Sequence, residues 1–192
     1  MGAETNVPEL IQAIRRGDRG GNPFVPIIAT SWSGHSEAVA ELMNSGADDV
    51  LLRPFSIATM TERVKALVTA RKDFVITSDY IGPDRGKMGA NSVAPGQFSP
   101  PNALRARVMN PDGLNMLEEA KELAEAKRRM SRDRVARLAR RVAMAAEVTI
   151  QAAGKGGSSS YVADMLETCA ELIRAARSAE AEEIDDLASV LE

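Results

Sequence analysis

Apolar residues recur every three or four positions in residues 7–16, 36–45 and 56–72, and this spacing predicts three amphipathic helices. Two short runs between these helices predict strands: residues 24–31, which are nearly continuously apolar, and residues 48–55, with an apolar burst of three residues. Helices that alternate with short buried strands are typical of a parallel sheet with helices on both faces. The first part of the chain is therefore predicted to be an α/β region.

The second part of the chain has a different pattern, which predicts helices only. The stretch from residue 113 to about 153 contains no proline, and no glycine after its first position. Within it Val135, Leu138 and Val142 recur at spacings of three and four, so we expect them to form a seam that packs against a partner helix. Residues 161–178 and 181–191 predict two further amphipathic helices.

A stretch rich in glycine, proline, serine and asparagine separates these two parts. It predicts a linker over residues 78–112. We therefore expect three segments: an α/β segment over residues 1–77, the linker, and a helical interaction domain over residues 113–192. The predicted fold class is α/β followed by all-α.

Composition narrows the possible functions. The net charge of −3 and the pI near 5.4 give no overall attraction to nucleic acid or to an anionic membrane. One cysteine, no signal peptide and no apolar run of about eighteen residues predict a cytoplasmic protein without a membrane partner. A single histidine argues against a histidine-rich metal site and a supported Ser-His-Asp triad, so we expect no metal, no cofactor and no catalytic residue.

Two motifs in the first segment carry a family resemblance. "VPIIATS", which ends at Ser31, is followed by "SGADDVLLRPFS", which contains Arg53. Together they resemble the second half of a response-regulator receiver domain of two-component signalling, here of the alphaproteobacterial type. The resemblance implies a flavodoxin-like, doubly wound sheet with strand order 2-1-3-4-5. It also implies that Ser31 is the switch hydroxyl, and that Arg53 takes the place of the family's phosphate-sensing lysine.

The sequence departs from the family at its beginning. "MGAE", residues 1–4, resembles the turn just after the aspartate that accepts phosphate in receivers. Phosphoryl transfer also needs clustered carboxylates for a divalent cation. Asp48 and Asp49 precede the second predicted strand, at the wrong end for such a metal, and are predicted to be solvated turn residues. We therefore expect a receiver-like segment that lacks its phosphoacceptor, through either a real absence or a late start codon.

The helical part offers a competing function. Residues 127–141 hold eight basic residues against one acidic residue, and Arg134, Arg137 and Arg141 share a helical face that could contact nucleic-acid phosphates. The acidic residues 179–186 offer a complementary surface on another helix, which favours a homodimer or a helical protein partner over nucleic acid. The sequence thus predicts a non-enzymatic phosphorelay signalling protein that acts by protein–protein interaction in a sensor-kinase pathway. The alternatives are a nucleic-acid-binding output protein and a non-functional truncation of a response regulator.

Overall fold

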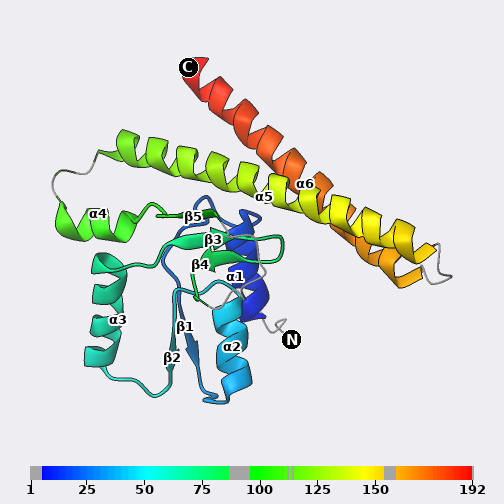
Figure 1. Cartoon of the computed structure of the whole chain (residues 1–192). Helices are drawn as coiled ribbons and strands as arrows, with labels where there is room; N and C mark the ends of the chain where they lie inside the picture. The colour runs from blue at the N-terminus through cyan, green and yellow to red at the C-terminus, as the bar shows by residue number, and fades with distance from the viewer. Residues whose placement is uncertain (1–5, 87–95, 112, 114, 154–158, 192) are drawn as a thin grey trace, which may run out of the picture. The chain divides into compact units, whose positions relative to one another are not determined.

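The computed structural model describes the backbone of residues 6–86, 96–111, 113, 115–153 and 159–191 (Figure 1). The chain divides into two compact units, residues 1–123 and residues 124–192, which are described separately below. The first unit is mixed α/β and the second is helical, so the predicted order of α/β followed by helices is confirmed. "MGAE" at residues 1–4 lies outside the described residues.

The first unit is built around a pair of parallel strands, β1 (Ile28–Ser31) and β2 (Asp49–Leu52). The helix α2 (Ser36–Asn44) connects them, while α1 (Val7–Arg16) precedes β1 and α3 (Ile57–Thr69) follows β2. Figure 1 shows α1 and α2 on one side of the pair and α3 on the other. The alternation of helices and strands predicted for this part is therefore confirmed.

The core of this arrangement lies between the strand pair and its first two helices. Ile11 of α1, Ala29 of β1, Leu42 of α2 and Ala47 form one buried apolar cluster. Local signals set the helix ends: Gly17 ends α1 with a positive φ of 82°. Burial of this cluster fixes which face of each helix meets the strands.

A second sheet, of three short strands, begins just before the predicted linker and continues within it. Strands β3 (Phe74–Ile76), β4 (Ile81–Pro83) and β5 (Gly96–Phe98) pair antiparallel in the order β4-β3-β5, and α4 (Ala103–Met109) follows them. The expected linker, residues 78–112, thus contains two strands and a helix among its described residues, while residues 87–95 and 112 lie outside them. Strands of three residues are too short to produce a readable alternation, and the glycine and proline of β4 and the glycine of β5 indicated a loop instead.

Three aromatic rings form the core of this second sheet. Phe24, Phe74 and Phe98 are buried, and their ring centroids lie 5.6 to 6.3 Å apart in edge-to-face arrangements. Such pairs are favourable beyond the apolar area that they bury. Phe24 comes from the segment between α1 and β1, so the cluster joins the two sheets of the first unit.

The second unit contains most of α5 (Met116–Ala153) and all of α6 (Ser159–Leu191). The sequence predicted a break near residue 179, but the backbone continues as one helix through this position. The residues there are good helix formers without glycine or proline, so nothing ends the helix. Arg141 of α5 and Asp164 of α6 form an ion pair at 3.7 Å, so the two helices contact each other there.

Candidate functional site

The carboxyl ends of β1 and β2 form the candidate site. The two strands run parallel, so both end at the same edge, where α2 and α3 also begin (Figure 1). In open α/β sheets this edge is where ligands bind. Ser31 and Arg53 meet here, because the backbone N–H of Arg53 donates to the carbonyl oxygen of Ser31 at 2.7 Å.

The Arg53 side chain lies across the end of the strand pair. Its Nε donates to the Thr30 Oγ1 at 3.0 Å, and its guanidinium carbon lies 5.5 Å from the centre of the Trp32 ring. The peptide bond between Arg53 and Pro54 is cis. No carboxylate among the described residues lies within ion-pair distance of this guanidinium. The site therefore presents a cation that is held in place and open to solvent.

The Ser31 hydroxyl forms hydrogen bonds within the segment that follows β1. It donates to the backbone oxygen of Ser33 at 3.0 Å and accepts from the backbone N–H of Ser33 at 3.1 Å. The hydroxyl that contacts Arg53 belongs to Thr30, which the sequence analysis missed. Neighbouring side chains of a strand point to opposite faces, so the pleat alone decides which of the two hydroxyls meets the cation.

Large apolar residues at the ends of β1 and β2 and at the start of α3 are exposed. Trp32 is 76% exposed, Leu52 46%, Phe55 37% and Ile57 87%. The segment between β1 and α2 lies close to the end of β2, because a methyl group placed on Gly34 would lie 3.5 Å from a methyl carbon of Leu52. We call the five residues Trp32, Leu52, Arg53, Phe55 and Ile57 the carboxyl-edge surface.

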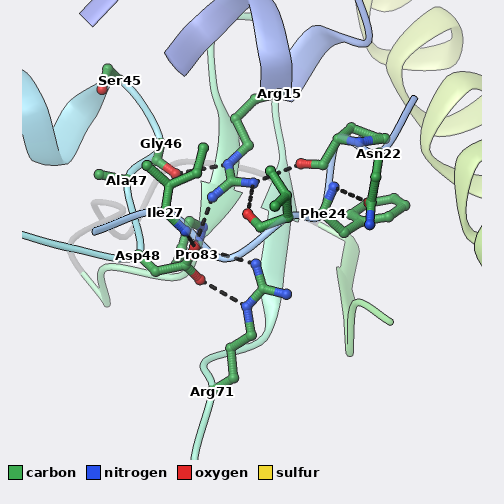
Figure 2. A network of polar contacts seen from close by, with 12 residues as sticks. Arg15, Asn22, Phe24, Ile27, Ser45, Gly46, Ala47, Asp48, Arg71 and Pro83 are labelled. Carbon is green, nitrogen blue, oxygen red and sulfur yellow. Dashed lines mark hydrogen bonds and ion pairs between the residues drawn. The ribbon is translucent and has the colours of Figure 1, made fainter. Parts of the chain in front are cut away.

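The opposite ends of the same strands hold a buried ion cluster (Figure 2). The Asp48 carboxylate accepts from Arg15 at 2.8 Å, from Arg71 at 2.8 and 3.3 Å, and from the backbone N–H of Ile27 at 2.8 Å. The side chains of Arg15, Asp48 and Arg71 are only 1%, 2% and 4% exposed. The prediction that Asp48 is a solvated turn residue is therefore wrong. Asp49, by contrast, pairs with the half-exposed Arg63 at 3.3 Å.

Arg15 connects this cluster to the surrounding backbone. Its Nε donates to the Gly46 oxygen at 2.8 Å, and its Nη1 donates to the oxygens of Pro23 and Val25, each at 2.7 Å. Burial lowers the pKa of Arg15 to about 10, against the opposing effect of Asp48, so the side chain stays charged at neutral pH. The role of the cluster is structural, since protein groups already satisfy both oxygens of its carboxylate.

The geometry of the cluster explains the motif "GADD". Gly46 has a φ of 103°, and a Cβ there would lie 2.8 Å from the Ile81 oxygen and 2.9 Å from the Arg15 side chain, so only glycine fits. A signal for Arg15 was present in the sequence, because it follows the core residue Ile11 by four positions and so shares its helical face. A charged residue on an apolar face predicts a buried partner, and Asp48 is that partner.

The seam residues and the aligned arginines that the sequence predicted in α5 are mostly buried or half-buried. Leu138 is fully buried, while Val135 and Val142 are half-buried. Of the three aligned arginines, Arg141 pairs with Asp164, the Arg137 Nε is buried, and Arg134 is half-buried. The basic face is thus partly engaged by the protein itself.

A shallow apolar groove lies elsewhere in the first unit, between α3 and α4. Its lining includes Met60, Val64, Val108 and Met109. No charged group other than Lys65 lines it.

Within the part of the chain that the structure describes, no three histidine, cysteine or acidic side chains lie together as a metal site requires. Among the described helices, none has the length and apolarity needed to cross a membrane. Comparisons with protein-family models, with curated proteins and with solved structures find no match to the chain.

Proposed function

We propose that the chain is a signalling protein of the response-regulator type that acts by binding other proteins rather than by catalysing a reaction. We propose also that the first unit is a partial flavodoxin-like fold. The observation that carries it is the meeting of Ser31 and Arg53 at the carboxyl edge of a parallel strand pair. The resemblance in sequence requires these two positions to lie together, although they are 22 residues apart in the chain.

The exposed side chains at this edge support a binding role. Trp and Arg are the side chains that most often dominate the energy of protein interfaces, and Trp32 and Arg53 are stacked on one another there. A monomeric protein rarely leaves neighbouring large apolar residues in solvent without a function. A sensor kinase is the partner class that the resemblance implies.

The helical part contributes a second binding surface in this proposal. Leu166 and Ile173 of α6 are 60% and 52% exposed, and their spacing of seven residues places them on one helical face. Another helix, from a second copy or from a different protein, could cover this face. Nucleic-acid binding gains no support from the arginines, because Arg141 already pairs with Asp164.

Two measurements on the purified 192-residue chain test the proposal. Isothermal titration against the cytoplasmic parts of the sensor kinases encoded in the same genome should find at least one that binds. Incubation with acetyl phosphate and Mg²⁺ should leave the intact mass unchanged. An acid-labile phosphoryl adduct on any aspartate, or no kinase binding together with tight and sequence-selective DNA binding, would contradict the proposal.

A further inference from the structure

The charges around the carboxyl-edge surface favour a negatively charged partner. The Nε of Arg53 donates to the Thr30 hydroxyl, whereas no described residue forms a hydrogen bond or ion pair with the two terminal nitrogens of Arg53. The two helices that begin here direct the positive ends of their dipoles to the same edge. At the start of α2, the side chain of His35 makes no capping hydrogen bond.

The carboxylates near this edge do not cancel that charge. Glu37 in the first turn of α2 makes no ion pair with Arg53, and Asp49 lies at the other end of β2, where it pairs with Arg63. The net charge of the whole chain is −3, so this edge is a local exception. A partner's carboxylate could form a bidentate pair with the free side of the guanidinium.

The apolar side chains decide between a small anion and a protein segment. A phosphate ion bound to Arg53 would leave Trp32 and Ile57 in water, whereas apolar side chains of a peptide would cover them. Nucleic acid binds through several cations that neutralise successive phosphates, and the carboxyl-edge surface contains one. The combination of one oriented cation with four exposed apolar residues fits a chain of mixed acidic and apolar residues.

We infer that the carboxyl-edge surface binds an acidic segment of a partner protein in which apolar side chains lie next to carboxylates. The apolar side chains cover Trp32, Phe55 and Ile57, and a carboxylate binds Arg53. This inference rests on the proposed protein-binding function and adds to it the surface and the chemistry of the partner.

Trp32 makes the inference directly testable, because it is the only tryptophan of the chain. The probe is a capped eight-residue peptide of alternating Leu and Asp, and the matched peptides carry Asn or Lys in place of Asp. The Leu-Asp peptide should shift the Trp32 emission to shorter wavelength in a saturable way. Its affinity should exceed that of the Leu-Asn peptide by about tenfold and should fall at high salt.

Two variants complete the test. Arg53→Gln should weaken the Leu-Asp peptide about tenfold, while the control Arg63→Gln should bind like the wild type, since Arg63 pairs with Asp49 instead. Iodide should also quench Trp32 more strongly than caesium, and less so in Arg53→Gln.

Three results would overturn the inference: no saturable change up to millimolar peptide, equal affinity for the Asn or Lys peptide, or unchanged affinity in Arg53→Gln. If a sensor kinase binds the chain while the acidic peptide does not, the proposed function stands and the partner chemistry inferred here is wrong.

Discussion

Replacement of Asp48 by asparagine should destabilise the first unit strongly. The carboxylate accepts four hydrogen bonds, three of them from the buried cations Arg15 and Arg71. An asparagine keeps one acceptor oxygen, turns the other into a donor that faces donors, and leaves both arginines without a counter-charge. Oδ1 accepts only from the Arg71 Nε, so an asparagine that keeps the three bonds of Oδ2 loses this charge-assisted bond, worth about 1.5–3 kcal/mol, and places a donor against a donor. With the counter-charge also gone, we expect a loss of about 3–5 kcal/mol, as when one partner of a buried ion pair is removed.

Asp49→Asn is the matched control, because it makes the same chemical change one position along the chain. Its ion pair with Arg63 is partly exposed, so we expect a loss of only about 1 kcal/mol. Hydrogen exchange measured by mass spectrometry in increasing urea, on peptides that contain β1 and β2, gives the free energy of unfolding of this unit apart from that of the helices. A loss in Asp48→Asn no larger than that in Asp49→Asn would refute the argument that the cluster holds the strand pair to α1.

Three further predictions follow from other parts of the structure. Leu138→Ala should lower the stability of the helical unit by about 2–5 kcal/mol, measured by circular dichroism at 222 nm in urea, whereas Met144→Ala, at a 69% exposed position, should change it by less than about 0.5 kcal/mol; equal effects would contradict the burial of Leu138. Burial raises the pKa of Tyr80 above the usual 10.0, so in Tyr161→Phe, which leaves Tyr80 as the sole tyrosine, the phenolate absorbance should titrate with a midpoint above that pH. Since the folded state then holds this proton more tightly than the unfolded chain, the contribution of Tyr80 to stability should fall as the pH rises past 10; a midpoint at or below 10 would show that the ring is solvated. Sedimentation velocity at micromolar concentration should report a dimer that becomes a monomer in the double variant Leu166→Asp, Ile173→Asp, and a monomeric wild type would leave the exposed face of α6 to a different protein.

The elements with a clear apolar period were predictable from the sequence. Residues 7–16 form α1 at the predicted positions, and the two parallel strands lie within the apolar runs predicted to form them. The small antiparallel sheet was not predictable, because its three-residue strands are defined by long-range pairing and by the packing of Phe24, Phe74 and Phe98. Local sequence carries little information about such contacts.

The candidate site was predicted in part. Ser31 and Arg53 were identified, and they meet at the expected edge. The contact between Arg53 and Thr30 and the stacking on Trp32 depend on strand pleat and side-chain rotamers, which a residue pattern does not determine. Asp48 was misread for a related reason: its burial follows from two arginines that are distant in the sequence.

Nuclear magnetic resonance can show whether the carboxyl edge of β1 and β2 is a protein-binding surface. The measurement compares amide chemical shifts of the full isotope-labelled chain before and after addition of a sensor-kinase domain that binds it. The largest shifts should cluster in residues 30–35 and 52–57, together with the indole N–H of Trp32. Shifts confined to the basic residues 127–141 or to the groove between α3 and α4, with the indole signal unchanged, would contradict a protein-binding role of this edge.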